Sequence, residues 1–346
     1  MKLISTASDA HLNDLIRKLA DRLKAGEPMV LPYSDFTDML TDLLGHVADG
    51  RERLVVAGHA TPDVQIAADR AGMQVTEVLG VSPFVHHNED LLEVIRKDSI
   101  VYIANPNWVS GANYSALDLE RIAGALTEGT LFIDEKYFDY YGITGLNLLQ
   151  KHAQVIVLRS LTAGFSIGSD DSGILISSPG FVRGIKGVFG WSRLSTTMHR
   201  ILSTTLVNMD IAEKRLREVR DESLRLATEL TRLGIQNRIT ATDFLLLRVA
   251  DPKRVGNHMA AHKTPVENLD GYPEMKHYMR YRVQSPLSND RFLTAASRMP
   301  KEFYHLKDLD RRAVMFHRAS AGDPQPESGE VLDRGAVEVL QTTNQS

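Results

Sequence analysis

The sequence predicts an α/β protein in which a mostly parallel β-sheet is covered by helices. Short apolar segments alternate with helical patterns between residues 53 and 178. The apolar segments carry few charges, which is typical of strands that are buried on both faces. Because strands that alternate with helices are joined by right-handed crossovers, this order favours a parallel sheet with helices on both sides.

The first region contains six segments that we expect to be strands. They are Leu54–Ala57, Gln74–Leu79, Ser99–Ala104, Thr130–Asp134, Gln154–Arg159 and Gly173–Ser177. Helical segments such as Pro62–Ala71 and Ser115–Leu126 lie between them. Ligands of such sheets bind beyond the carboxyl ends of the strands, so the residues that directly follow each strand are the candidates for function.

A second, smaller α/β domain is expected after a long helix. Apolar residues recur at helical spacing from about residue 191 to residue 233, and Gly234 is suited to end this helix. Two expected strands, DFLLLRV and HYMRYRV, follow. We therefore expect a large α/β domain over 1–208 and a small α/β domain over 209–317. Residues 318–346 are rich in Gly, Pro, Ser and Glu, a composition that predicts poor order.

Composition excludes several classes of protein. The chain has 346 residues, a net charge of -4 and no Lys/Arg-rich segment, so no nucleic-acid partner is expected. It has no cysteine, which excludes disulfides, zinc–thiolate sites and a thiol nucleophile and is compatible with a reducing compartment. No apolar stretch is long enough to cross a bilayer, and no membrane partner is expected. These observations together predict a soluble cytoplasmic protein.

Three familiar kinds of site are not supported by the motifs. LFIDE at 131–135 would suit the acidic strand of an ATPase, but the phosphate loop G-x-x-x-x-G-K-[ST] is absent. No G-x-G-x-x-G follows an expected strand, so a dinucleotide site is also excluded. His86, His87, Glu89 and Asp90 are too close in sequence to converge readily on one ion. We interpret them as a solvated turn and expect no metal.

Four segments carry the candidate functional residues. Ser34 and Asp35 precede an apolar-periodic segment, so they open a helix either as a plain N-cap or as a phosphate-binding helix start. NPNWVSG at 105–111 follows one expected strand, and Asp134 in IDEKYFDYYG ends another. The fourth segment, 155–177, has two expected strands joined by a Gly/Ser-rich loop.

In this order the four segments resemble the class I/II aminotransferases of fold type I, which depend on pyridoxal 5′-phosphate, and above all their histidinol-phosphate branch. That family has a G-S-D-E-like helix start, an N-P-N-N-P-T-G loop, a D-E-A-Y strand end and an R-S-[FL]-S-K segment. The corresponding residues here are Tyr33–Phe36, Asn105–Gly111, Asp134–Tyr137 and Arg159–Ala163. The resemblance covers about residues 28–303.

The resemblance implies a cofactor site and a substrate. A buried carboxylate keeps the pyridine nitrogen protonated, and Asp134 corresponds to that residue; Tyr137 corresponds to the phenol near O3′. The other positions that the resemblance places at the cofactor are Ser34, Asp35, Thr61, Trp108, Ser160, Thr162 and Asp171. Arg280 or Arg282 is expected to receive the anionic group of an amino acid or a similar substrate. The family also implies a homodimer, with active sites between subunits.

The chain departs from the family at several of these positions. Ala163 stands where the family has the lysine that forms a Schiff base and moves a proton, and alanine can do neither. Trp108 replaces the loop asparagine, and Thr61 replaces the aromatic residue that stacks on the ring, a role for which His59 is a substitute. Asp171, preceded by another aspartate, replaces the phosphate-binding arginine, and carboxylates repel a phosphate.

Two origins of Ala163 and several functions remain open at this point. In the first, the lysine was replaced deliberately to trap an inactive form, and the retention of Asp134 and Tyr137 favours this origin. In the second, it was lost by natural divergence, and Trp108 and Asp171 favour that origin. The leading function is a PLP-dependent aminotransferase that is inactive or altered as given. The alternatives are a decarboxylase or other lyase, a non-catalytic or repurposed binding protein, and cofactor-independent chemistry through His59 or the acidic pair at 170–171.

Overall fold

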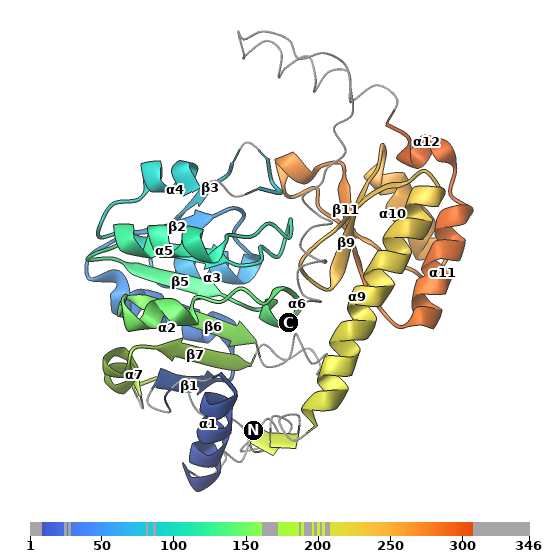
Figure 1. The fold of residues 1–346 in the computed structure, drawn as a ribbon. Helices are drawn as coiled ribbons and strands as arrows, with labels where there is room; N and C mark the ends of the chain where they lie inside the picture. Colours follow the sequence, from blue (N-terminus) through green and yellow to red (C-terminus); the bar gives the residue numbers. More distant parts are fainter. Residues whose placement is uncertain are drawn as a thin grey trace, which may run out of the picture. The chain divides into compact units, whose positions relative to one another are not determined.

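The structure, a computed structural model, describes residues 9–23, 26, 29–80, 82–85, 88–160, 172–186, 188–189, 196, 199–200, 203–204 and 208–306. The chain divides into two compact units (Figure 1). The first consists of Met1–Glu222, Thr240–Asp243 and Gly271–Met275, and the second of Ser223–Ile239, Phe244–Asp270 and Lys276–Ser346. The end of the large domain was predicted at residue 208. The tail for which poor order was predicted, residues 318–346, lies outside the described part of the chain.

A seven-stranded sheet in the order β1-β7-β6-β5-β4-β2-β3 forms the centre of the first unit. The four pairings from β6 through β5, β4 and β2 to β3 are parallel, and β7 pairs antiparallel with both β6 and β1. The mostly parallel sheet predicted from the sequence is therefore confirmed. The strands are β1 (Val30–Tyr33), β2 (Arg53–Ala57), β3 (Gln74–Val78), β4 (Ile100–Ala104), β5 (Thr130–Asp134), β6 (Val155–Ser160) and β7 (Gly173–Ser177).

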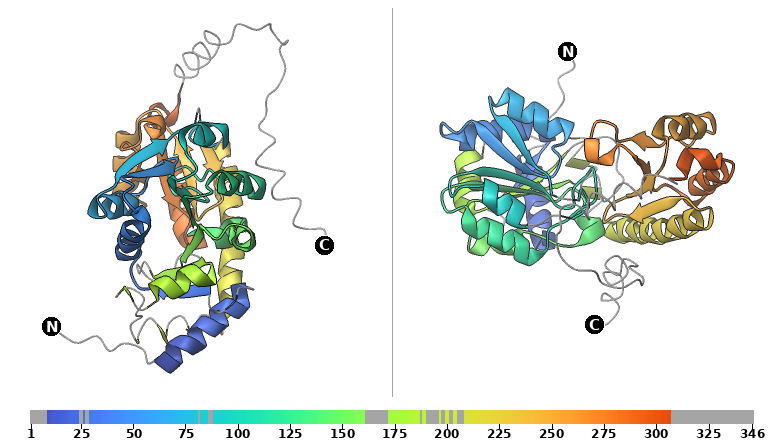
Figure 2. Two further views of the ribbon diagram at one scale, coloured as in Figure 1. Left: turned by 90° about the vertical axis from the view of Figure 1, so that its left-hand side faces the viewer. Right: turned by 90° about the horizontal axis from the view of Figure 1, so that it is seen from above.

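Helices cover both faces of this sheet, and a hydrophobic core lies on each face (Figures 1 and 2). One core joins the sheet to α1 (Asp9–Leu23), α4 (Asn88–Val94) and α5 (Ala116–Ala125). The other joins it to α2 (Phe36–Ala48), α3 (Pro62–Arg70) and α7 (Pro179–Ile185). Side chains of a strand alternate between the two cores, as in β5, where Leu131 and Ile133 pack into the first and Phe132 into the second. Two short elements, α6 (Phe138–Tyr141) and the 3₁₀ helix η2 (Leu146–Gln150), follow β5.

Strand β1 is the element of the first sheet that the sequence analysis did not predict. Its four residues pair antiparallel with β7, from Val30 opposite Ile176 to Tyr33 opposite Gly173. The strand is short and contains Pro32, which is tolerated because β1 lies at the edge of the sheet and needs no second ladder of hydrogen bonds.

The second unit has a four-stranded antiparallel sheet in the order β10-β11-β9-β8. The expected strands DFLLLRV and HYMRYRV form β9 (Phe244–Arg248) and β11 (Tyr278–Arg282). The other elements are β8 (Gln236–Ile239), β10 (Glu267–Asn268), α10 (Pro252–Ala261), α11 (Pro286–Ser297) and α12 (Lys301–Tyr304). The 3₁₀ helix η4 (Pro273–Met275) belongs to the first unit.

The long helix α9 (Met209–Arg232) crosses the division between the units. Gly234 follows it with φ of 78°, the left-handed conformation expected of a residue that ends a helix. Among the described residues, no helix combines the length and the apolar character that crossing a membrane requires.

Candidate functional site

A pocket lies in the first unit at the carboxyl ends of β4, β5 and β6, the edge that the parallel sheet predicts for a ligand. Ala104, Asp134 and Ser160, the last residues of these three strands, line it. The empty space at this pocket amounts to about 670 Å³, a figure that includes open solvent. Its remaining walls are Tyr33, Phe36, Thr61, Asp63, Pro106, Trp108, Lys136 and Tyr137.

Asp134 is the buried acid of this pocket, with 8% of its surface exposed. Its Oδ2 accepts a hydrogen bond of 2.6 Å from the Tyr102 hydroxyl, and its Oδ1 accepts one of 2.9 Å from the Lys136 backbone N–H. Burial raises the pKa of the Asp134 carboxyl, while the Tyr102 hydrogen bond and the charge of Lys136 act in the opposite direction. A cation or a protonated nitrogen in the pocket would stabilise the charged form of a carboxylate in this position.

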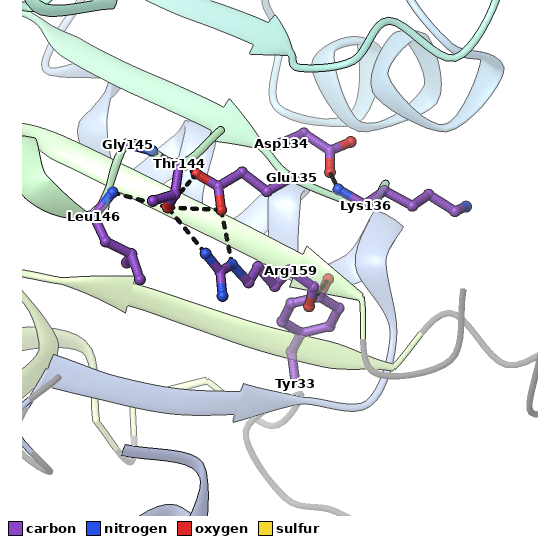
Figure 3. Close-up of polar contacts among 8 residues, drawn as sticks. All are labelled: Tyr33, Asp134, Glu135, Lys136, Thr144, Gly145, Leu146 and Arg159. Carbon is purple, nitrogen blue, oxygen red and sulfur yellow. Dashed lines mark hydrogen bonds and ion pairs between the residues drawn. The ribbon is translucent and has the colours of Figure 1, made fainter. Parts of the chain in front are cut away.

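Glu135, which lies between Asp134 and Lys136 in the sequence, is held in a separate buried cluster (Figure 3). Its side chain is fully buried and pairs with the Arg159 guanidinium, with an Nε to Oε2 distance of 2.7 Å. Glu135 also accepts hydrogen bonds from the Thr144 hydroxyl at 2.9 Å and the Gly145 N–H at 2.6 Å. The guanidinium of Arg159 lies 3.6 Å from the centre of the Phe138 ring. These contacts fix the loop that carries Lys136 and Tyr137.

The loop after β4 forms another wall and is stabilised internally. It begins with a cis peptide bond between Asn105 and Pro106. The Asn107 side-chain oxygen accepts hydrogen bonds from the backbone N–H groups of Val109 and Ser110 at 2.9 and 3.2 Å. Trp108 lies within this hydrogen-bonded turn, and its ring lies edge-to-face on Tyr272 with centroids 6.4 Å apart.

Two helix starts border the pocket, and both are capped by side chains. Asp35 is exposed and accepts a 2.8 Å hydrogen bond from the Asp38 N–H. It is therefore the N-cap of α2, which is one of the two roles expected from the sequence. Ser34 is half-buried and lies between two residues that line the pocket. Thr61 lines the pocket and caps α3 by accepting a 3.0 Å hydrogen bond from the Val64 N–H.

Further expected site residues are not among the described residues that line this pocket. Ala163, Thr162 and Asp171 lie outside the described residues. Arg280 belongs to the second unit, where its guanidinium bonds both carboxylate oxygens of Glu267 at 2.6 to 2.9 Å and lies 5.1 Å from the Phe244 ring centre. Arg282 is exposed at the end of β11.

His59, considered above as a ring-stacking or acid–base residue, is buried beside the pocket. It does not line the large cavity but a smaller one, together with Ser110 and Glu274. Its Nδ1 lies 3.4 Å from a Glu77 carboxylate oxygen and its Nε2 lies 3.3 Å from one of Glu274. The imidazole thus lies near two carboxylates that come from distant parts of the sequence, and it is the contact of Nδ1 with Glu77 that has the geometry of a hydrogen bond.

Six lining residues of the large pocket were not predicted as site residues, and two of these, Ala104 and Pro106, lie at the end of β4 and just after it. Tyr33 and Phe36 belong to the helix-start motif but were not predicted as walls, and Asp63 was interpreted only as part of a helix. Lys136 carried a signal, since the family motif D-E-A-Y has an alanine at its position. Of the described residues that line the pocket, only Lys136 carries a cationic group.

Comparison with known proteins finds sequence similarity to the family that these motifs resemble. No family model matches the chain. The histidinol-phosphate aminotransferase of Chlorobaculum tepidum is 27% identical over 210 residues, which cover 59% of this chain and 59% of that protein. The enzyme of the same name from Chlorobium luteolum is 28% identical over 207 residues, covering 58% of this chain and 56% of that protein.

Part of this chain is thus similar in sequence to histidinol-phosphate aminotransferases. The match spans less than three-fifths of the length of each of these two relatives. The solved histidinol-phosphate aminotransferase of Clostridium acetobutylicum aligns with a TM-score of 0.76 at 16% identity, covering 86% of this chain and 91% of that one. That of Sinorhizobium meliloti, in complex with pyridoxal-5′-phosphate, aligns with a TM-score of 0.75 at 17% identity, covering 84% and 82%. These likenesses confirm the predicted fold, that of the fold-type-I transferases.

The donor set of the large pocket fits the ring of such a cofactor. A buried carboxylate with a raised pKa faces a cavity walled by aromatic side chains, and a protonated ring nitrogen is the kind of partner that stabilises its charged form. The second lining carboxylate, Asp63, is less suited to an anionic group, because it adds a negative charge to the wall.

Proposed function

We propose that this aminotransferase-related chain binds pyridoxal 5′-phosphate in the large pocket and that, with Ala163 in place, it transaminates slowly or not at all. The single observation that carries this proposal is Asp134, a buried carboxylate that lines the pocket at the end of β5. Bound there, the cofactor supplies an electron sink for carbanion chemistry on an amino acid.

Each protein group has a defined part in this proposal. Asp134 holds a proton at the ring nitrogen, and Tyr102 orients the carboxylate through its 2.6 Å hydrogen bond. Tyr137, which is 4% exposed, lines the pocket and serves as the phenol near the ring oxygen. Phe36 and Trp108 also line the pocket and would shield a bound ring from water. We further propose that Ser34 and the start of α2 contribute to phosphate binding, and Arg280 or Arg282 to the substrate's anionic group.

The loss of activity follows from chemistry rather than from geometry. Alanine has no amine, so position 163 cannot form a bond with an aldehyde or carry a proton between carbon atoms. Removing a residue of this kind from an enzyme typically costs several orders of magnitude in rate. The expected substrate is an amino acid or an amino-acid-like compound, and the expected assembly is a homodimer in the cytoplasm.

One specific observation favours a second function, a repurposed binding protein that does not use the cofactor. The pocket carries a second carboxylate, Asp63, and four aromatic side chains, Tyr33, Phe36, Trp108 and Tyr137. Aromatic faces and carboxylates together suit an organic cation. In this alternative the fold is retained and Asp134 pairs with the ligand's positive charge.

An absorption titration separates the two functions. The full chain, an Ala163→Lys variant and an Ala163→Lys variant that also carries Asp134→Asn are titrated with pyridoxal 5′-phosphate. The first function predicts saturable binding by the full chain and a borohydride-reducible yellow adduct in the Ala163→Lys variant. It also predicts weaker binding when Asp134 is replaced. If none of the three binds the cofactor, the repurposed-protein alternative is favoured and the first proposal is wrong.

A further inference from the structure

Lys136 lines the pocket in which we propose that the ligand binds. It follows β5 by two residues and lines the same cavity as Asp134 and Tyr137. Figure 3 shows its side chain extending away from the Glu135–Arg159 cluster. Among the described lining residues it is the one that carries an amine.

The backbone of Lys136 is held in place from both sides. Its N–H donates to the Asp134 carboxylate at 2.9 Å, which fixes the turn at the strand end. The preceding side chain, Glu135, is fully buried against Arg159, and the following residue, Tyr137, is 4% exposed. A four-carbon stem joins this fixed backbone to the amine of Lys136, and its length gives the amine reach within the pocket.

The chain also has alanine and lysine at interchanged positions relative to the motifs it resembles. The family pattern has alanine within D-E-A-Y and lysine at the end of R-S-[FL]-S-K, whereas this chain has Lys136 and Ala163. The lysine of the R-S-[FL]-S-K motif is thus absent from the sequence, while Lys136 brings an amine to the end of β5, where the family motif has alanine.

We propose that Lys136 supplies the amine that position 163 lacks and forms a covalent bond with an aldehyde ligand in this pocket. The inference rests on the proposed function, because that aldehyde is pyridoxal 5′-phosphate. In its neutral form the Lys136 nitrogen attacks the carbonyl carbon, so a carbon–nitrogen bond forms. The carbonyl oxygen leaves as water with two protons taken from the nitrogen, which yields a carbon–nitrogen double bond without oxidation or reduction.

Borohydride trapping followed by peptide mass mapping tests this directly. The full chain is mixed with one equivalent of pyridoxal 5′-phosphate, reduced, digested and mapped, with absorption recorded before reduction. Lys136→Arg keeps the positive charge but does not form the bond, and Lys136→Met removes both. Lys97→Met is the matched control, because Lys97 pairs with Glu128 before the amino ends of β4 and β5, away from the pocket.

The expected result is one adduct on the peptide that contains residue 136. It is lost in Lys136→Arg and Lys136→Met and retained in Lys97→Met, while circular dichroism of all four proteins is the same. Bound cofactor with no reducible adduct, or an adduct on another peptide, overturns the role of Lys136 and leaves the proposed function standing. Absence of any bound cofactor in both the full chain and Ala163→Lys overturns the two proposals together.

Discussion

Arg159 and Glu135 form an ion pair inside the first unit, with an Nε to Oε2 distance of 2.7 Å and side-chain exposures of 10% and 0%. The pair joins the end of β6 to the residue after β5, and Thr144 bonds both partners. Because the loop that follows Glu135 carries two walls of the pocket, this ion pair positions the candidate site although neither charged group lines it.

Replacing Arg159 with methionine is expected to lower the free energy of unfolding by about 3–5 kcal/mol, because a buried Glu135 then loses its charged partner. Equilibrium urea unfolding measures the change. The matched control is Arg121→Met, whose partner Glu89 is 66% exposed, and its expected cost is about 1 kcal/mol or less. Equal costs for the two variants would show that the buried pair does not stabilise the loop.

The raised pKa of Asp134 predicts a pH dependence of opposite sign to that of an ordinary salt-bridged acid. The folded protein holds this proton at pH values where the unfolded chain has released it, so the contribution of Asp134 to stability falls as pH rises through its folded pKa. Asparagine cannot ionise. The unfolding free energy of Asp134→Asn, minus that of the unchanged chain, should therefore increase with pH above the ordinary carboxyl range.

The size of this increase is about 1.4 kcal/mol for each unit by which the folded pKa exceeds the unfolded one. Urea unfolding of both proteins at a series of pH values from the ordinary carboxyl range upwards provides the curve. A difference that stays constant or decreases with pH would mean that the Tyr102 hydrogen bond and the Lys136 charge outweigh burial at this carboxyl.

The sequence predicted those parts of the fold and the site that depend on local pattern. Asp134 was found because it ends an apolar strand, and the strand pattern also predicted β4 to β7 within a residue or two. Strand β1 was missed because Pro32 and a length of four residues give no strand pattern, and pairing with β7 supplies the stabilisation instead.

Long-range partners were not predictable in the same way. Glu135 and Arg159 are 24 residues apart, and no periodicity indicates that they pair. The same holds for His59, whose carboxylate partners Glu77 and Glu274 come from β3 and η4. Lys136 was predictable in principle, because it departs from a motif whose other residues match.

The junction of β1, β6 and β7 gives a prediction about packing. A Cβ added at Gly173 would lie 2.2 Å from the Arg159 carbonyl oxygen and 2.2 Å from the Tyr33 hydroxyl, so the backbone of β6 would have to move. Gly173→Ala is expected to destabilise the protein by about 1–3 kcal/mol, measured by thermal or urea unfolding.

The control for this packing prediction is Gly124→Ala in α5. Apart from its chain neighbours and the backbone of its own helix, no atom lies within 4 Å of its added Cβ, and alanine in place of glycine stabilises a helix by up to about 0.5–1 kcal/mol. The two variants should therefore shift the unfolding midpoint in opposite directions. A stabilising Gly173→Ala would contradict the close contact of Tyr33 with β7.

The central claim is that the large pocket is a pyridoxal 5′-phosphate site from which one amine is missing at position 163. The most direct measurement is cofactor binding by Ala163→Lys beside the unchanged chain, followed by absorption and by mass after borohydride reduction. The account predicts saturable binding by both proteins and, in Ala163→Lys alone, a reduced adduct on the peptide containing position 163. Absence of cofactor binding in both proteins would contradict it.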